Sequence, residues 1–243
     1  MLTTRDFPDP GMPVRARTTL STVAFSPCGF VRGDSFLQLK SIYEIDKSKK
    51  NGVLSLESVR SFLAFDIDSD AVRKKLTDVQ TLLVRTGADL KPVEPENIHI
   101  TMRFLGNVSE NTVEKIFGSM QKLNFTPFDV KIHGVGAFPD VRYPRVVWAG
   151  ITEGANDLRQ IFSQLEPHLQ ASGFPPDPKG FSPHLTIARV RSVKNKAELA
   201  KFVTDSKDFQ FGIVRAKCFR LKKSELTPRG PIYSTLREFC PPG

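Results

Sequence analysis

The 243-residue sequence contains only three cysteines, Cys28, Cys218 and Cys240, and they lie far apart in the chain. They form no CxxC pair, so they predict neither a disulfide framework nor a zinc site, and they favour a reducing cytoplasm as the location. The apolar stretches fall far short of the ~20 residues that cross a bilayer, so we expect no transmembrane helix and no membrane partner. The sequence also lacks a phosphate-binding P-loop, which argues against ATP-dependent nucleotidyl transfer.

Acidic residues are outnumbered by basic ones. The chain has 35 Lys and Arg against 26 Asp and Glu, which gives a net charge of +9. Residues 1–58 contribute only +2 of this charge, and residues 59–243 contribute +7. A basic folded region suits a polyanionic partner such as nucleic acid, but a generally basic soluble protein has the same composition. Charge alone leaves both interpretations open.

Residues 1–58 differ from the rest of the chain. Proline and glycine recur in them, no amphipathic period persists, and the segment ends in the polar run DKSKKNG at 46–52. We expect an irregular or disordered N-terminal extension. Two explanations are open: a processed targeting peptide, although the apolar core of a secretory signal is missing, or a translation start assigned too far upstream. The folded domain is expected at residues 59–243.

Two copies of one short pattern lie in this domain. His-Ile-Thr-Met occupies His99 to Met102, and His-Leu-Thr-Ile occupies His184 to Ile187. Apolar residues alternate in both copies, which is typical of a half-buried strand. Successive side chains of a strand point to opposite faces, so each histidine shares a face with the threonine two residues later. A single HxT occurs often by chance, whereas two copies on strand patterns are much harder to dismiss.

Periodicity and capping signals predict that strands and helices alternate along the domain. The expected strands are residues 59–67, the two motif strands, 128–138, 144–151, 209–215, 217–222 and 231–238; the expected helices are 70–86, the stretch after Ser109, 153–172 and 196–204. The order strand-helix-strand-helix-strand is passed through roughly twice, with one motif each time. This duplication predicts two lobes of similar fold, each of which carries one motif to a shared cleft.

Five blocks follow one another between residues 60 and 239: RSFLAFDI, NIHITMRFLG, GVGAFP with PRVVWAGI, FSPHLTIARVR, and SELTPRGPIYSTL. In this order they resemble the 2H phosphoesterases, and most closely the RNA 2′,3′-cyclic phosphodiesterases, which are also called 2′-5′ RNA ligases. The resemblance implies an α+β fold in which two pseudo-symmetric lobes with antiparallel sheets flank a central cleft, with helices on the outside. It also implies an enzyme that needs no metal, and we expect a monomer without a cofactor.

The resemblance further implies a role for each motif residue. His99 would donate a proton, His184 would accept one, and Thr101 and Thr186 would bind phosphate. Histidine suits both proton transfers because its unperturbed pKa lies near neutrality. The hydroxyls can hold the non-bridging oxygens and the charge that builds on them. The expected reaction converts RNA 2′,3′-cyclic phosphodiester ends to 2′-phosphomonoesters.

Phe104 and Arg189 each lie five residues after a motif histidine, at positions that can approach the substrate base in the family. Strict alternation places such a residue on the opposite face from the histidine, so contact with the base requires a strand end or a bulge. Arg103 shares the His99 face by alternation, where it either holds phosphate or lies at a solvated rim.

Four further residues are assigned to structure rather than chemistry. His133 and His168 have no matching threonine, Tyr233 is expected to serve packing, and Trp148 is expected in the core.

Three functions remain open. The first is cyclic phosphodiesterase activity on RNA ends, the second is 2′-5′ ligation of RNA such as tRNA halves, and the third is a non-catalytic RNA-binding module. The first two use the same residues, so the sequence does not rank them. Two intact histidines argue against the third function, because binding alone does not require two titrating groups.

Overall fold

The structure is a computed structural model that describes residues 58–178, 180–228 and 230–242. The extension expected at residues 1–58 lies outside these residues, apart from Ser58. The described strands are β1 (Val59–Asp66), β2 (Leu90–Pro92), β3 (His99–Val108), β4 (Phe128–Phe138), β5 (Val146–Ile151), β6 (His184–Val190), β7 (Gln210–Ala216), β8 (Phe219–Leu226) and β9 (Pro231–Phe239). The helices are α1 (Asp70–Arg85), the short 3-10 helix Pro95–Asn97, α2 (Glu110–Met120), α3 (Ala155–Ala171) and α4 (Lys196–Asp205). The expected strands and helices are confirmed, and β2 has no counterpart among them.

The strands form one antiparallel sheet in the order β7-β4-β5-β6-β3-β1-β8-β9, with β2 paired to β6. The sheet consists of two four-stranded halves. We call β7-β4-β5-β6 the β6 half and β3-β1-β8-β9 the β3 half. A single residue pair, Ile100 and Leu185, joins the halves. The α+β class with antiparallel strands is therefore confirmed, and each half carries one of the two motifs.

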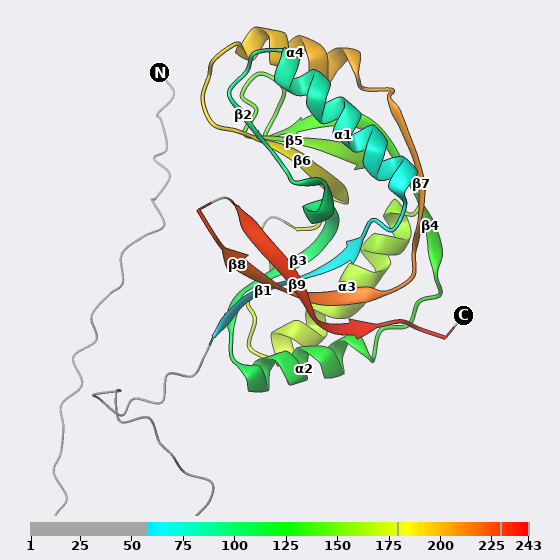
Figure 1. Cartoon of the computed structure of the whole chain (residues 1–243). Helices are drawn as coiled ribbons and strands as arrows, with labels where there is room; N and C mark the ends of the chain where they lie inside the picture. Colours follow the sequence, from blue (N-terminus) through cyan, green and yellow to red (C-terminus); the bar gives the residue numbers. More distant parts are fainter. Residues whose placement is uncertain (1–57, 179, 229, 243) are drawn as a thin grey trace, which may run out of the picture. The chain divides into compact units, whose positions relative to one another are not determined.

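The halves are not two successive stretches of the chain, as the duplicated order of elements suggested. β1 pairs with β8, so β1 and β3 share one half with β8 and β9 from the far end of the sequence. The helices are also not divided between the halves in chain order: α1 packs on β7 and α4 on β4, whereas α2 packs on α3 and β9. Figure 1 shows α1 and α4 with the upper strands and α2 and α3 with the lower ones. Periodicity predicted the elements but not their partners, because pairing is decided by contacts between distant parts of the chain.

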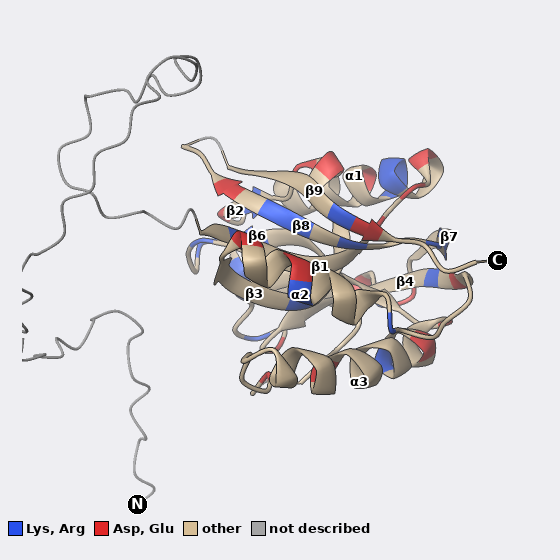
Figure 2. Cartoon of the chain, turned by 90° about the horizontal axis from the view of Figure 1, so that it is seen from below, with Lys and Arg blue, Asp and Glu red and all other residues tan. Residues whose placement is uncertain are grey.

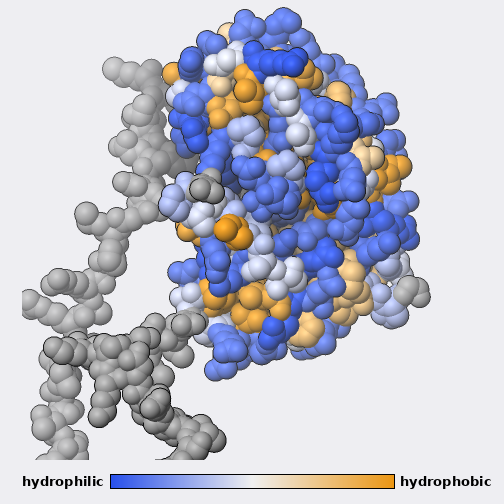
Figure 3. Space-filling view, viewed as in Figure 1, coloured by the Kyte–Doolittle hydropathy of each residue, from blue (hydrophilic) through white to orange (hydrophobic). Residues whose placement is uncertain are grey.

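Local sequence explains where the first helices begin and which face they bury. The Ser69 side chain accepts a hydrogen bond from the Val72 amide at the start of α1, and Ser109 accepts one from the Thr112 amide at the start of α2. α1 then buries Val72, Leu76, Val79, Gln80 and Leu83. This spacing is that of one helix face. On the surface seen in Figure 3, hydrophobic residues form patches among hydrophilic ones. No helix among the described residues is long and apolar enough to cross a membrane.

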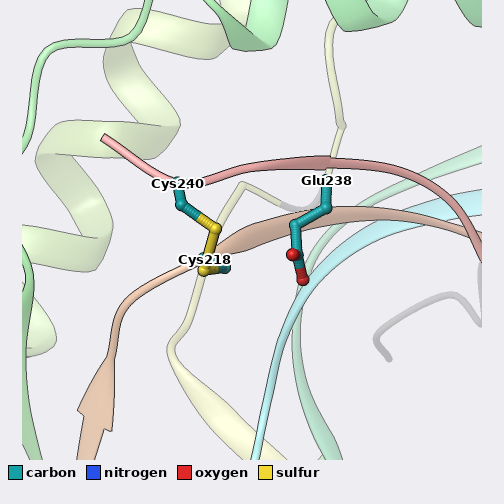
Figure 4. Close-up of side chains that lie close together, drawn as sticks. All are labelled: Cys218, Glu238 and Cys240. Atoms are coloured by element: carbon teal, nitrogen blue, oxygen red, sulfur yellow. A yellow bond between two sulfur atoms is a disulfide. The ribbon is translucent and has the colours of Figure 1, made fainter. Parts of the chain in front are cut away.

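A disulfide joins Cys218, just before β8, to Cys240, just after β9 (Figure 4). The prediction that the cysteines form no disulfide framework was therefore wrong for this pair. The two residues are 22 positions apart, and the pairing of Phe219 with Phe239 brings them together. Disulfides persist in oxidising compartments and are rare in the cytoplasm. Cysteine usage thus no longer favours the cytoplasmic location expected from the sequence.

Candidate active site

The two motifs meet at the joint between the halves. Ile100 and Leu185 face each other across β3 and β6 and are almost fully buried, with exposed fractions of 1% and 0%. Their neighbours on each strand point to the opposite face. His99 and Thr101 flank Ile100, and the same arrangement holds for His184 and Thr186 around Leu185. All four polar side chains therefore lie on one face of the sheet, and each residue is partly exposed.

His99 is held by two hydrogen bonds. Its Nδ1 lies 2.8 Å from the carbonyl oxygen of Asn97, and its Nε2 lies 2.8 Å from Thr101 Oγ1. A carbonyl only accepts, so Nδ1 carries a proton and donates it. In the neutral ring Nε2 then has the free lone pair and accepts from the Thr101 hydroxyl. This arrangement fixes the tautomer and leaves Nε2 as the atom that can exchange a proton with a substrate.

His184 has the same anchor. Its Nδ1 lies 2.7 Å from the carbonyl oxygen of Ser182, again two residues before the histidine. The same physical consequence follows: Nδ1 donates to the carbonyl and Nε2 is the exchangeable position. The two motifs thus share a local geometry as well as a sequence pattern.

Both motif strands contain a bulge at the same place. In the pairing of β1 with β3, Leu63 is opposite Arg103 and Ala64 is opposite Thr101, so Met102 has no partner. In the pairing of β5 with β6, Ile187 has none, since Val147 is opposite Ala188 and Trp148 is opposite Thr186. Met102 and Ile187 are each the third residue after the motif histidine. An extra residue in a strand reverses the faces of the residues beyond it.

The bulges bring Phe104 and Arg189 to the histidine face. Phe104 is opposite Phe62, its ring centroid is 6.2 Å from that of Phe62, and it is 60% exposed. Arg189 is exposed. Burial raises the pKa of Tyr233, and the charge of Arg189 opposes this shift from across the joint. Both side chains therefore lie on the histidine face, which is the placement that contact with a substrate nucleobase requires.

The same bulge sends Arg103 to the other face. Arg103 is 9% exposed; its Nε donates to Glu166 of α3 at 2.7 Å, and its Nη1 lies 3.4 Å from a carboxylate oxygen of Asp177. Neither role expected for Arg103 is correct, because the side chain is neither in the histidine site nor at a solvated rim.

Aromatic rings surround each histidine. Phe62 stacks on His99 with ring centroids 4.8 Å apart, and Tyr233 meets the same ring edge-on at 5.4 Å. On the other half, Phe138 packs edge-on against His184 at 4.9 Å, and Trp148 lies at 6.5 Å.

Two of these rings correct expectations from the sequence. Trp148 shares the face of Thr186, its opposite residue, and is partly exposed rather than part of the core. Tyr233 does pack, as expected, but it packs against a candidate catalytic ring.

A buried lysine lies on the His99 face and was not predicted. Lys222 is 7% exposed, and its Nζ binds both carboxylate oxygens of Asp66, at 2.6 and 2.8 Å. Asp66 is opposite His99 in the sheet, and Arg220 lies 3.2 Å from the same carboxylate. Figure 2 shows basic segments along β8 with an acidic one at its arrowhead, and both signs of charge on β9. A fixed positive charge therefore lies near His99, largely compensated by Asp66.

Burial depresses the pKa of both histidines. Desolvation is the main cause for His99 and lowers its pKa to about 4. The hydrogen bond to Asn97 opposes this shift, Lys222 adds to it, Asp66 opposes it, and a charge on His184 adds to it. The pKa of His184 is lowered by burial, and its bond to Ser182 opposes the change. Each imidazole is therefore neutral near pH 7 in the free protein, and the two are close enough to influence each other.

Among the described residues, one group of three potential metal ligands lies close together, and it is outside this site. It consists of Cys218, Glu238 and Cys240 (Figure 4). Both sulfurs belong to the disulfide, and Glu238 pairs with Arg220. These atoms are already engaged in other bonds.

Paired imidazoles and hydroxyls on one face have the chemistry to serve phosphoryl transfer, and comparison with known families gives a class that performs it. A family model described as LigT-like phosphoesterase matches residues 67–148 and 150–233. The chain belongs to this family, the 2H phosphoesterases, and is a phosphoesterase enzyme.

Several relatives are similar over nearly their whole length. A protein of Aeropyrum pernix named RNA 2′,3′-cyclic phosphodiesterase is 40% identical over 164 residues, which is 68% of this chain and 93% of the relative. A protein of Archaeoglobus fulgidus with the same name is also 40% identical, over 74% of this chain and 99% of the relative.

Solved structures share the fold. A crystal structure of a Thermus thermophilus protein has a TM-score of 0.61 at 28% identity and covers 74% of this chain and 97% of its own. Escherichia coli LigT complexed with 3′-AMP has a TM-score of 0.63 at 22% identity, over 76% of this chain and 98% of its own. At that identity the likeness to LigT concerns the fold alone.

Proposed function

We propose that the protein hydrolyses RNA ends that carry a 2′,3′-cyclic phosphate and leaves a 2′-phosphomonoester. One observation carries the proposal: His99 and His184 lie on one face beside the single residue pair that joins β3 to β6, and each has its Nδ1 anchored by a carbonyl. Two fixed imidazoles whose Nε2 atoms are the exchangeable positions are what an acid and a base on opposite sides of one phosphorus require. The names of the relatives support the same substrate.

The two imidazoles divide the proton transfers between them. His184 accepts a proton from water as the water oxygen attacks phosphorus. The bond from phosphorus to the ribose 3′ oxygen breaks, and His99 donates a proton to that oxygen. The phosphate stays on the 2′ oxygen. The direction of transfer follows the family resemblance, and the same steps with a 5′-hydroxyl in place of water as the nucleophile would be ligation.

The threonines serve the phosphate. In the free protein the Thr101 hydroxyl is bound to His99 Nε2 at 2.8 Å. A phosphate in the site offers non-bridging oxygens as stronger, charged acceptors. The Thr101 hydroxyl then turns to the phosphate, which frees Nε2 for proton exchange. Thr186 stands in the same relation to His184 by sequence and by strand position.

His99 must be protonated in order to act as an acid, and the anionic substrate promotes this protonation. With a pKa of about 4, His99 is neutral near pH 7 in the free protein. A phosphate anion next to Nε2 favours the charged imidazolium and raises this pKa. Protonation of His99 is therefore coupled to substrate binding, and the His99 ring is uncharged in the empty site.

Phe104 and Arg189 are proposed to hold the terminal base. The exposed Phe104 ring offers a stacking surface beside Phe62, and the planar Arg189 guanidinium comes from the other half. The substrates that fit are RNA ends, tRNA fragments among them, and one chain contains all of these groups, so we propose that a monomer is active.

The test is to incubate the purified protein with an RNA that ends in a 2′,3′-cyclic phosphate and compare the product with authentic 2′- and 3′-phosphate standards. The proposal predicts the 2′-phosphate. A new 2′-5′ bond to an added 5′-hydroxyl RNA, with no hydrolysis, would replace hydrolysis by ligation as the function. Binding of the RNA without any turnover would show a non-catalytic RNA-binding module.

A further inference from the structure

A second surface lies at the far end of β6 from His184. A groove of about 370 Å³ is formed there, and its charged lining side chains are all basic: Arg145, Arg191, Lys194 and Lys196. Tyr143 and Val193 also line it and are 66% and 81% exposed. We call this surface the basic groove. None of its residues is used by the chemistry proposed above.

The two segments that build the basic groove carry a strong excess of positive charge. Residues 139–145 and 189–196 together contain six Lys and Arg and one acidic residue, Asp140. The Asp140 carboxylate accepts hydrogen bonds from the backbone amides of Arg142 and Tyr143, so it is occupied within its own turn. Lys196 is also the first residue of α4, where the helix dipole adds positive potential. The groove therefore suits a polyanion.

An aromatic ring is held at the edge of this positive surface. The Nζ of Lys196 lies 3.6 Å from the centroid of the Tyr143 ring. This contact ties the segment between β4 and β5 to the start of α4. Basic side chains together with an exposed aromatic ring are the combination that binds single-stranded nucleic acid, by backbone charge and by base stacking.

Backbone hydrogen bonds and one ring contact connect the basic groove to the histidine site. The Val190 amide donates to the Arg145 carbonyl at 2.9 Å, and the Arg145 amide donates to the Phe138 carbonyl at 2.7 Å. Phe138 in turn packs on the ring of His184. Along β6, His184 and Val190 are six residues apart, which is about 20 Å in a strand. Arg189 lies between them on the histidine face, so positive charge extends from the site to the groove.

We propose that the basic groove binds the RNA strand upstream of the cyclic phosphate end, with its backbone phosphates on Arg191, Lys194 and Lys196 and a base against Tyr143. The inference rests on the proposed function, because the terminal nucleotide must sit between His99 and His184. A cyclic mononucleotide in that position does not reach the groove. The protein therefore distinguishes long RNA from mononucleotides by substrate binding rather than by chemistry.

The experiment compares two substrates and two matched double variants. The substrates are a cyclic 2′,3′-mononucleotide and a single-stranded RNA decamer with a 2′,3′-cyclic phosphate end. The groove variant is Lys194→Ala/Lys196→Ala. The control variant is Lys115→Ala/Lys122→Ala, which removes two lysines, Lys115 and Lys122, that are exposed on and just after α2.

The groove variant should raise KM for the decamer about tenfold and reduce the salt slope of its binding by about 1.4, since two phosphate contacts are lost at about 0.7 each on a single strand. Turnover of the mononucleotide should stay within twofold of wild type for both variants. Tyr143→Ala, a second probe, should weaken decamer binding about tenfold through lost stacking. Equal losses for both substrates, no change in the salt slope, or the same loss in the control variant would overturn the proposal.

Failure of the proposed function gives a different result. If wild type turns over neither substrate, the reaction assigned above is wrong, and the groove is tested by fluorescence anisotropy with a labelled 3′-phosphorylated RNA decamer. The same decamer affinity in the groove and control variants would overturn the groove. Displacement of the decamer by an equal concentration of a glutamate decapeptide would also overturn it, in favour of an acidic peptide as the occupant.

Discussion

Ile100 and Leu185 form the single pair that joins the strand of one histidine motif to the strand of the other. Both side chains are buried, so the core fixes the joint from one face while His99 and His184 occupy the other face. The position of the site thus follows directly from the packing beneath it. This relationship allows the roles of individual residues to be separated by experiment.

Arg103 is expected to matter for stability and not for phosphate binding. Its ion pair with Glu166 is buried, with side-chain exposures of 9% and 12%. Removal of one partner leaves a buried charge without compensation, so Arg103→Ala should lower the free energy of unfolding by about 3–5 kcal/mol in urea titrations. The folded variant should keep wild-type KM. A stable variant with a strongly raised KM would mean that Arg103 holds phosphate.

Thr101 and Thr186 should affect both binding and rate, because phosphate is held before and during the reaction. Replacement of either by Val keeps the shape but removes the hydroxyl, and kcat/KM should fall about 10- to 100-fold, the range of a hydrogen bond to a charged group. Thr→Ser at the same position is the matched control and should recover most of the loss. If Ser and Val variants are equally impaired, the hydroxyl is not what the phosphate needs.

The stability of the free protein should fall as the solution becomes acidic. The pKa of His99 is about 4 when folded and about 6.5 when unfolded, so the unfolded state binds more protons between these values. The contribution of His99 to the free energy of unfolding is fully present above pH 6.5 and is lost as the pH falls towards 4. The loss is at most about 3 kcal/mol, and it is smaller the more solvent reaches the ring.

His99→Gln should therefore flatten the dependence of unfolding free energy on pH between 7 and 4.5, as measured in urea. His133→Gln, which removes a histidine outside the site, is the matched control variant for the measurement. Identical pH dependence in wild type and His99→Gln would show that His99 is not desolvated in the folded protein.

Alternation in the sequence predicted the motif strands and the face that each histidine shares with its threonine. It misplaced Arg103 because a bulge adds one residue without a sequence signal, and the faces beyond Met102 are then exchanged. The bulge at Ile187 exchanges the faces in the same way and brings Arg189 to the histidine face.

Lys222 was missed for another reason. Alternation along β8 does place Arg220 and Lys222 on one face, but only the pairing of β1 with β8 brings that face to Asp66, 156 residues away. The disulfide from Cys218 to Cys240 depends in the same way on the pairing of β8 with β9.

Metal removal should not affect turnover. The acid, the base and the phosphate ligands proposed here are all side chains of the protein. Dialysis against EDTA should leave kcat and KM for a 2′,3′-cyclic phosphate unchanged. Activity that is lost on dialysis and returns with a divalent ion would require a metal in the mechanism.

The central claim is that His99 and His184 act together as acid and base. The most direct measurement is single-turnover kinetics on a 2′,3′-cyclic phosphate RNA for His99→Ala, His184→Ala, the double variant and the control His133→Ala. Each single variant should lose on the order of 10²–10⁴ in rate with little change in substrate affinity. The rate loss of the double variant should be far smaller than the product of the two single rate losses, because the pair works as a unit. The control should keep its rate. A folded His99→Ala or His184→Ala protein with a near-normal rate would contradict the account.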